Sequence, residues 1–298
     1  MTSRWVLGAR PRTLPVAVVP VAVGTAAALG FGDGSGGVEP VIVWRAVAAL
    51  VASLALQVAT NFVNDYADGE RGTDDTRVGP VRLVASGLAT AREVKFAALA
   101  AFGVAGVAGG ALAYAIGWEL LAVGALSMLA GWAYTGGPKP YGYLGLGEVF
   151  VFVFFGLVAT VGSFYVQVET VNLLAFLAAI PVGLLAVALL VINNLRDIPG
   201  DSASGKQTLA VRLGDHRTRQ LYVGLLGAVA FGIVLCSIVR PPALVGLIGL
   251  LAARGPLQAV RQGSTGRDLI PVLGMTGKAQ LFTGLLLAAG LVVGGLVD

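Results

Sequence analysis

The sequence predicts an all-α integral membrane protein with about nine transmembrane helices. Hydrophobic residues make up 56% of the chain and charged residues only 12%, whereas a soluble globular domain carries roughly 25% charge. The mean hydropathy is +0.84. Because so few charged side chains cannot cover a water-facing surface, we expect most of residues 1–298 to lie in a lipid bilayer as a single domain.

Nine apolar runs along the chain have the length of a membrane span. A bilayer core of about 30 Å needs about 20 apolar residues in a helix. Gly and Ala are abundant in these runs, as expected where helices pack closely in lipid. The first run contains Pro15 and Pro20 and continues as a span, so it is not typical of a cleavable signal peptide. The runs lie near residues 13–31, 41–63, 93–116, 119–136, 146–167, 171–193, 220–239, 242–260 and 279–297.

Lys and Arg are distributed unevenly between the segments that join these runs. With the amino terminus inside, 18 of the 20 lie in or beside inside segments, and only Arg45 and Arg240 lie outside. This asymmetry follows the positive-inside rule. It also accounts for the net charge of +4, so nucleic acid is not expected as a partner. The inside segments are 1–12, 64–92, 137–145, 194–219 and 261–278.

We therefore expect a multi-pass protein of the plasma membrane, or cell inner membrane. Its amino terminus should be cytoplasmic, where most Lys and Arg lie. Its carboxyl terminus should be outside, because an odd number of spans places the two termini on opposite sides of the membrane. The single cysteine, Cys236, lies in an apolar run and excludes a disulfide framework or a multi-cysteine metal site. It is expected to pack as a small hydrophobic side chain.

An acidic cluster in residues 61–75 directly follows the second apolar run. If the helix continues past the membrane surface, Asn61, Asp65 and Asp68 share one face, at positions i, i+4 and i+7. Like charges at such spacing destabilise a helix unless a cation lies between them. The alternative is that these acidic residues are simply solvated in a loop, although acidic groups at a membrane boundary tend to be functional.

A second acidic cluster, residues 193–201, follows the sixth apolar run. Asp197 and Asp201 are again four residues apart, although Pro199 disfavours a continuous helix between them. The interval from Asp65 to Asp197 is 132 residues, and each cluster ends the second span of a unit. This weak repeat suggests duplicated halves around a shared site.

The ligand chemistry of the two clusters favours magnesium over zinc. Hard oxygen ligands without nearby His or Cys suit Mg²⁺, which is usually shared with substrate phosphates. Two clusters that face each other would hold a magnesium diphosphate, with basic residues neutralising the remaining phosphate charge. The catalytic and metal-binding candidates are Asp65, Asp68, Asp74, Asp197 and Asp201. The substrate-binding candidates beside them are Asn61, Asn64, Asn193, Arg71, Arg77, Arg82, Lys206 and Arg212.

Both motifs resemble known aspartate-rich motifs. Asn64-Asp65-Tyr66-Ala67-Asp68 and Asp197-Ile198-Pro199-Gly200-Asp201 resemble those of the UbiA superfamily of intramembrane prenyltransferases. The chain is most similar to the branch of 1,4-dihydroxy-2-naphthoate polyprenyltransferases of menaquinone synthesis. Gly72 stands where the superfamily pattern has a further Asp, and an acid follows at Asp74. The other matching segments are 10–15, 72–82, 134–138 and 205–214.

The resemblance implies a bundle of nine helices around a central cavity, beneath a cytoplasmic cap formed by the loops near 64–92 and 194–219. It implies transfer of a prenyl group from a polyprenyl diphosphate, with Mg²⁺, to an aromatic acceptor. In this branch the acceptor is 1,4-dihydroxy-2-naphthoate, which loses its carboxylate to give demethylmenaquinone. The length of the prenyl chain depends on the shape of the cavity, and the oligomeric state is unknown from the sequence.

For several further side chains the sequence supports two interpretations, one with a role in the site and one without. Tyr134 and Lys139 either bind the acceptor carboxylate or hydroxyls, or contact lipid headgroups. Arg10 and Arg12 either reach the mouth of the cavity or only fix the topology. Glu148 opens the fifth run and is a candidate for the edge of the site. A set of phenylalanines is available to wall the cavity, but lipid-facing packing is expected for most of Phe150, Phe152, Phe154, Phe155 and Phe164.

Two other functions remain open. The acceptor can be a different aromatic compound, such as 4-hydroxybenzoate, homogentisate or haem, although the Gly72-Thr73-Asp74 variant and the amino-terminal segment 10–15 argue against this. A cation-coupled transporter also uses intramembrane carboxylates, but it needs them near the bilayer midplane. Here the carboxylates lie at span ends.

Overall fold

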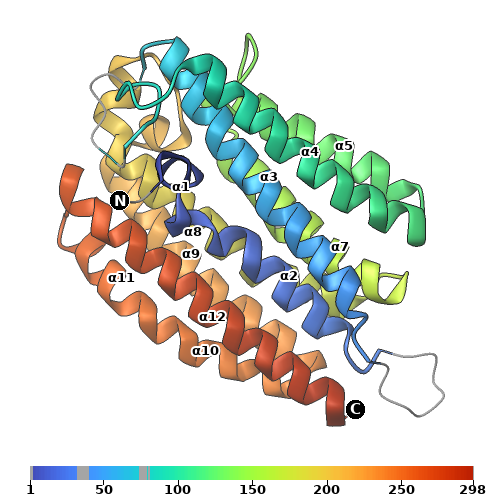
Figure 1. The fold of residues 1–298 in the computed structure, drawn as a ribbon. Helices are drawn as coiled ribbons and strands as arrows, with labels where there is room; N and C mark the ends of the chain where they lie inside the picture. The colour runs from blue at the N-terminus through green and yellow to red at the C-terminus, as the bar shows by residue number, and fades with distance from the viewer. Residues whose placement is uncertain (1–2, 32–39, 74–78, 80, 298) are drawn as a thin grey trace.

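The computed structural model describes residues 3–31, 40–73, 79 and 81–297, and within these ranges the chain is a bundle of helices (Figure 1). The fold class is the predicted one. The elements are α1 (Arg4–Ala9), η1 (Pro11–Thr13), α2 (Pro15–Ala28), α3 (Val43–Glu70), α4 (Ala91–Ala115), α5 (Glu119–Ala133), η2 (Tyr141–Leu144), α6 (Gly147–Val151), η3 (Phe152–Val158), α7 (Ala159–Val168), α8 (Leu173–Ala203), α9 (Leu209–Val239), η4 (Pro241–Val245), α10 (Gly246–Gly249), η5 (Leu250–Ala253), α11 (Arg254–Arg261), η6 (Gly266–Asp268) and α12 (Leu269–Val297).

Each of the nine predicted runs coincides with a helical segment in the described part of the chain, but their lengths differ. Seven helices there are long and apolar enough to cross a membrane, or eight if the pair Arg4–Thr13 and Pro15–Ala28, bent by 53°, counts as one span. The ninth segment, α5, has 15 residues and is shorter than a full span. The count of nine is therefore approximate.

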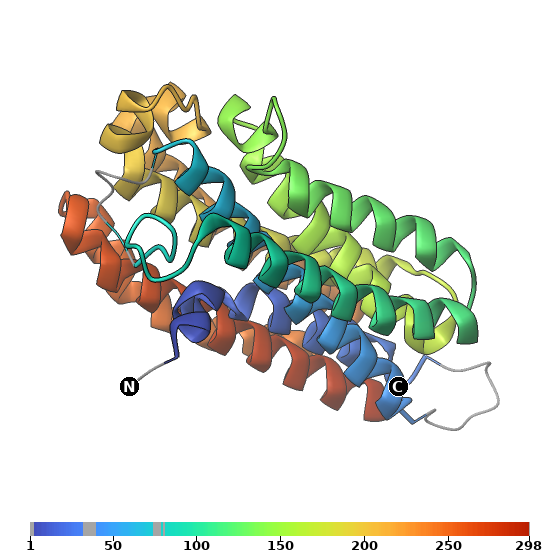
Figure 2. The same cartoon turned by 45° about the horizontal axis from the view of Figure 1, so that its top comes forward.

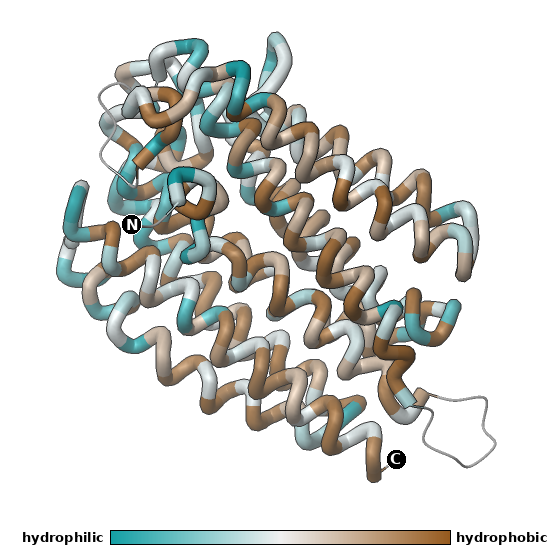
Figure 3. Tube along the Cα trace, viewed as in Figure 1, coloured by the Kyte–Doolittle hydropathy of each residue, from teal (hydrophilic) through white to brown (hydrophobic). Residues whose placement is uncertain are grey.

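The long helices lie side by side, and their polar residues gather at one end of the bundle (Figures 1 and 2). Figure 3 shows hydrophobic residues along the length of the bundle and hydrophilic ones around α1 and the end of α3. The amino-terminal end of the chain lies at this polar end, and the carboxyl-terminal end lies at the opposite one. The two acidic clusters consequently share the polar end of the molecule.

Helix α8 forms the centre of the fold. Of its most apolar stretch, 72% is buried inside the protein. Its side chains join two core clusters, one mainly with α9 and α12 and one with α2, α7, α9 and α12. Cys236 is fully buried in the second of these clusters, as a small hydrophobic side chain was predicted to be. A helix so enclosed holds the groups at its end in fixed positions.

Both helices that carry acidic clusters run beyond their apolar part. Helix α3 continues to Glu70, so its acidic residues lie on helical turns. Helix α8 continues through Pro199 to Ala203, and the interruption expected there is wrong. Proline removes the hydrogen bond to the carbonyl four residues earlier, here that of Leu195, but the rest of the last turns persists. The segment 194–219 is thus mostly helix, because α9 begins at Leu209.

Candidate active site

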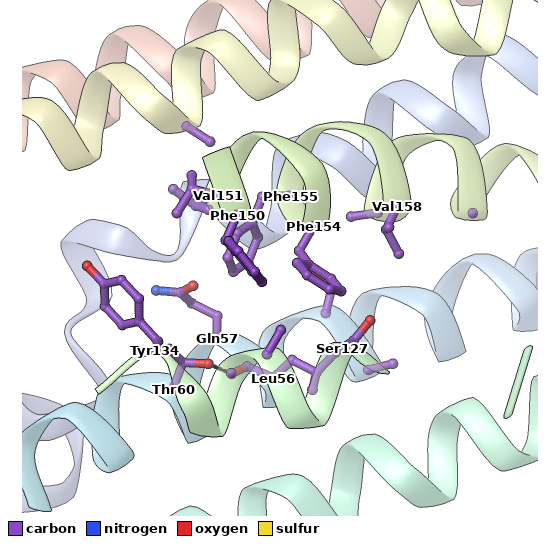
Figure 4. A pocket seen from close by; sticks show the side chains of 18 of the residues that line it. Leu56, Gln57, Thr60, Ser127, Tyr134, Phe150, Val151, Phe154, Phe155 and Val158 are labelled. Carbon is purple, nitrogen blue, oxygen red and sulfur yellow. Dashed lines mark hydrogen bonds between the residues drawn. The ribbon is translucent and has the colours of Figure 1, made fainter. Parts of the chain in front are cut away.

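A long cavity of about 280 Å³ runs through the bundle between α2, α3, α5, α7 and α8 (Figure 4). On α3 its lining extends from Ala49 to Asn64, which corresponds to roughly 22 Å of helix. Apolar and small residues line most of it, and polar groups gather at the end nearest the acidic clusters. These polar groups are Arg10, Thr13, Gln57, Thr60, Asn61, Asn64, Tyr134 and Asn193.

Aromatic side chains form one wall of this cavity. Phe150, Phe154 and Phe155 line it (Figure 4), and Tyr141 stacks on Phe150 with ring centroids 3.9 Å apart. The wall includes the π-helical stretch η3, a feature common at functional sites. Its wider turns keep positions four residues apart on the cavity face.

The prediction that most of the phenylalanines face lipid is therefore wrong. Three of the five line the cavity. Phe164 is fully buried in a core cluster, and Phe152 packs against another. The sequence alone does not distinguish these faces, because the whole stretch from 149 to 155 is apolar.

A small polar pocket of about 40 Å³ adjoins the cavity at its polar end. Its lining includes Asp68 from α3 and Asp197 and Asp201 from α8. The two spaces share three lining residues, Asn64, Tyr134 and Asn193. The structure thus brings the two predicted clusters together and opens them onto an apolar chamber. The other residues of the polar pocket are Arg82, Thr135, Gly142, Tyr143, Asn194, Lys206 and Thr208.

Asp68 is the meeting point of three segments in the polar pocket. It forms an ion pair of 2.9 Å with the Lys206 ammonium and accepts a hydrogen bond from the Tyr143 hydroxyl. The Lys206 ammonium also lies 4.7 Å from the centroid of the Tyr143 ring. Burial by itself would lower the pKa of Lys206, but Asp68, with Tyr143 and Asp201, outweighs it and the pKa is raised. Burial and the negative charge of Asp68 likewise raise the pKa of Tyr143.

Asp197 is held by the preceding residue. The Arg196 guanidinium donates to both carboxylate oxygens of Asp197 at 2.7 Å, and to Asn193 Oδ1 at 2.9 Å. Arg196 is 3% exposed, and its Nη1 has no partner among the described residues. Buried donors of this kind are costly to leave unpaired. Arg196 itself does not line the polar pocket, so it acts there by orienting Asn193 and Asp197.

Asp65 is separated from the other predicted carboxylates. It is fully buried, lines neither space, and accepts hydrogen bonds from the backbone N–H groups of Leu83 and Val84 at 2.8 and 3.0 Å. These bonds tie the segment after the first acidic cluster to α3. Arg71 braces a different segment, since its guanidinium donates to the carbonyls of Thr135 and Gly137.

The remaining predicted residues fall into three groups. Asp74 and Arg77 lie outside the described residues. Arg82 and Asp201 line the polar pocket, whereas Lys139 is exposed and lines neither space. Arg212 is also exposed, and its guanidinium donates to the carbonyl of Gln207.

Two polar residues near the polar pocket, Arg196 and Tyr143, were not assigned to the site from the sequence. Arg196 stands inside the second cluster, where an arginine beside a carboxylate is a usable signal. Tyr143 carries no signal beyond being an aromatic residue in a polar loop. Glu148, which was a candidate for its edge, is 6% exposed and accepts a hydrogen bond of 2.9 Å from the Asn194 amide. It positions a residue of the polar pocket without lining the pocket itself.

The donor set of the polar pocket fits a hard divalent cation. It presents the carboxylates of Asp68, Asp197 and Asp201 together with the Asn64 amide oxygen, which is buried and has no partner in the described structure. Within the same described ranges, no three His, Cys, Asp or Glu side chains are grouped closely enough to hold a metal by themselves. Magnesium needs no such cage, because it keeps waters and shares substrate phosphates.

The family model of the UbiA prenyltransferase family matches residues 17–268. The chain belongs to the UbiA prenyltransferase family. It is 48% identical to a 1,4-dihydroxy-2-naphthoate octaprenyltransferase of Mycobacterium tuberculosis, over 99% of this chain and 98% of that one. It is 38% identical to the protein of the same name from Escherichia coli, over 97% and 95% of the two chains.

The fold is also that of a solved member of the family. A UbiA homologue from Archaeoglobus fulgidus, whose structure was solved with DMAPP and Mg²⁺, superposes with a TM-score of 0.60. The match covers 96% of this chain and 99% of the other, at 15% identity. The multi-pass membrane architecture of this UbiA protein thus follows from both its helices and its family.

Proposed function

We propose that this UbiA protein transfers a polyprenyl group from a polyprenyl diphosphate to 1,4-dihydroxy-2-naphthoate. The prenyl group replaces the carboxylate, CO₂ and diphosphate leave, and the direct product is the quinol form of demethylmenaquinone. Support comes from relatives up to 48% identical over nearly the whole chain, which are named 1,4-dihydroxy-2-naphthoate octaprenyltransferases. The observation that carries the proposal is the junction of a charged polar pocket with a long apolar cavity through Asn64, Tyr134 and Asn193.

The diphosphate and its metal would occupy the polar pocket. Asp68, Asp197 and Asp201, with the Asn64 oxygen, would hold Mg²⁺, which fits their hard oxygen chemistry. When bound, the metal neutralises charge on the leaving diphosphate. Lys206, in the same pocket, would supply an ammonium to a phosphate oxygen.

The prenyl chain would lie in the cavity, with its reactive carbon at the junction. An allylic cation formed there must meet an electron-rich ring before it meets water, which requires a dry chamber. The aromatic wall of Tyr141, Phe150 and Phe154 excludes water and presents ring faces to a cation. Tyr134, which lines both spaces, is placed to contact the acceptor.

In the cell, we propose that the protein lies in the plasma membrane with its polar end in the cytoplasm. The amino terminus and the segments near 64–92 and 194–219, which form the cap of the single domain, would then be inside. The carboxyl terminus would be outside. The gathering of polar residues at one end supports a common side for both clusters.

The test is product analysis with the purified protein, one long-chain polyprenyl diphosphate and Mg²⁺. The acceptors are offered in parallel: 1,4-dihydroxy-2-naphthoate, 4-hydroxybenzoate, homogentisate and haem. With the naphthoate alone we expect release of CO₂ and a prenylated quinol, which air oxidises to the quinone during extraction. Prenylation of another acceptor in its place would overturn the acceptor assignment, and diphosphate-independent cation flux without any product would favour a transporter.

A further inference from the structure

The polar end of the cavity contains a chain of hydrogen bonds in which each donor and acceptor can be assigned. The Thr13 hydroxyl donates to the carbonyl of Arg10 at 2.9 Å. A carbonyl can only accept, so the single hydrogen of this hydroxyl is used there, and Thr13 Oγ1 can only accept further bonds. The Asn61 amide nitrogen supplies one of them at 3.3 Å, and it also donates to the carbonyl of Ala9 at 2.9 Å.

Gln57 is the last member of this chain. Its amide nitrogen, Nε2, donates to Thr13 Oγ1 at 3.3 Å and to Asn61 Oδ1 at 3.4 Å. If the amide were turned over, its oxygen would face these two oxygens, neither of which has a hydrogen to donate. The network therefore fixes the orientation of the Gln57 amide, with its nitrogen toward Thr13 and Asn61.

This orientation leaves the carbonyl oxygen of Gln57 for a ligand. Gln57 lines the cavity and is 8% exposed (Figure 4). Its Oε1 accepts no hydrogen bond from the part of the chain that the structure describes. The hydroxyl of Thr60, one turn further on, is bound to the Leu56 carbonyl of its own helix at 2.9 Å. A buried acceptor without a donor is costly, so this oxygen suits a hydroxyl of a bound molecule.

We propose that Gln57 accepts a hydrogen bond from the distal hydroxyl of the aromatic substrate, and so selects dihydroxy over monohydroxy substrates. This inference rests on the proposed function, which supplies 1,4-dihydroxy-2-naphthoate as that substrate. Its hydroxyl at carbon 1 adjoins the reacting carbon, and its distal hydroxyl, at carbon 4, lies further round the same ring. A hydroxyl in an apolar chamber costs free energy unless it is bonded. A substrate without the distal hydroxyl would instead leave the Gln57 oxygen unpaired.

The position of Gln57 agrees with the place of the reaction. Gln57 and Asn64 both line the cavity from α3, and they lie seven residues apart, or about 10.5 Å along the helix. The reacting carbon, with its carboxylate, must meet the prenyl carbon at the junction marked by Asn64. The distal hydroxyl of the same ring would extend from the junction into the cavity, on the side of Gln57. The interval between the two residues accommodates the prenyl carbon and one aromatic ring.

The experiment crosses one substitution with the presence of one hydroxyl. The kcat/KM for 1,4-dihydroxy-2-naphthoate and the inhibition constant of 1-hydroxy-2-naphthoate, which lacks the distal hydroxyl, are measured for the wild type and for Gln57→Leu. We expect Gln57→Leu to lower kcat/KM for the dihydroxy compound on the order of 10- to 100-fold. The inhibition constant of the monohydroxy compound should change by less than about threefold, and the KM for the polyprenyl diphosphate should be unchanged.

Ser127→Ala is the matched control. Ser127 also lines the cavity, but its hydroxyl is bound to the Val123 carbonyl of its own helix at 2.8 Å. Its removal should leave the discrimination between the two compounds unchanged. Gln57→Met keeps the length of the side chain without the oxygen and should reproduce the result of Gln57→Leu, so either variant that folds decides the question.

The wild type provides a test that needs no variant. The inhibition constant of the monohydroxy compound should exceed the KM for the dihydroxy compound by at least about tenfold, and equal values would overturn the proposal. Equal loss for both compounds in the Gln57 variants, no loss for either, or the same change in Ser127→Ala would also overturn it. A wild-type protein without naphthoate prenylation would instead overturn the proposed function.

Discussion

Lys206 and Asp68 form a buried ion pair, 2.9 Å long, that joins the turn between α8 and α9 to the end of α3. Lys206 is 7% exposed and Asp68 is 2% exposed. A buried charge pair is weak support for stability, because desolvation offsets much of its attraction. It does, however, place an ammonium beside a predicted metal ligand. Lys206 lines the same pocket, so it would lie beside a diphosphate whose metal Asp68 would hold.

Replacing Lys206 with alanine should therefore reduce turnover on the order of 100-fold, because one charged contact to the leaving group is lost in a dry site. The measurement is the initial rate at saturating diphosphate and Mg²⁺, normalised to folded protein. Lys139→Ala, at an exposed position that lines neither space, is the control and should leave the rate unchanged. A rate for Lys206→Ala within about threefold of wild type would remove Lys206 from the site.

Activity should require a divalent cation, and Asp68→Asn or Asp197→Asn should lose most of it. Each substitution keeps the shape of the side chain and removes one charge from the pocket. Treatment with a chelator should abolish turnover, and Mg²⁺ should restore it in the wild type but not in the variants. Near-normal turnover of either purified variant would contradict its assignment as a ligand.

Asp65→Asn should behave differently from Asp68→Asn. Its two hydrogen bonds from backbone N–H groups involve a charged acceptor, and loss of one such bond costs about 1.5–3 kcal/mol. We expect a lower unfolding temperature in detergent, with an unchanged Mg²⁺ concentration for half-maximal activity in the fraction that remains folded. A shifted Mg²⁺ requirement at normal stability would show instead that Asp65 acts on the metal.

Gly162→Leu should shorten the prenyl donors that the cavity accepts. Gly162 lines the cavity, and a Cβ built there meets no atom within 4 Å, so a leucine would extend into the space. The kcat/KM for a long-chain diphosphate should fall about tenfold, while that for geranyl diphosphate should hardly change. Gly110→Leu is the control, because Gly110 also has open space but lies outside the cavity lining. Equal effects on both donors, or equal effects in both variants, would contradict a role of Gly162 in accommodating the long prenyl chain.

The topology can be tested by cysteine labelling after Cys236 is replaced by alanine. A probe at Ala85, which is exposed near the polar end, should be protected from an impermeant reagent in intact cells. A probe at Thr170, exposed after α7, should react. Both expectations follow from the uneven distribution of Lys and Arg. Labelling of Ala85→Cys from outside would reverse the orientation.

The sequence by itself determined the class of fold and identified several polar residues of the candidate site. Low charge and long apolar runs predict a bundle of membrane helices. A helix forms its backbone hydrogen bonds within a single segment, so each run can cross the lipid as a helix. The i, i+4 spacing of Asp197 and Asp201 identified two of the residues that line the polar pocket. These signals are local, and short stretches of sequence carry them.

Only the tertiary structure decided which polar groups face one another. Asp65 and Asp68 stand three residues apart in one motif, yet the first holds the backbone at Leu83 and the second meets Lys206. The faces of the apolar stretch from Phe150 to Phe155 were equally undetermined, because lipid and an apolar cavity select the same side chains. Arg10 acquired its place in the cavity from a left-handed turn and its contact with Asn61 on α3. Contacts between distant segments depend on how helices pack, and no local pattern encodes them.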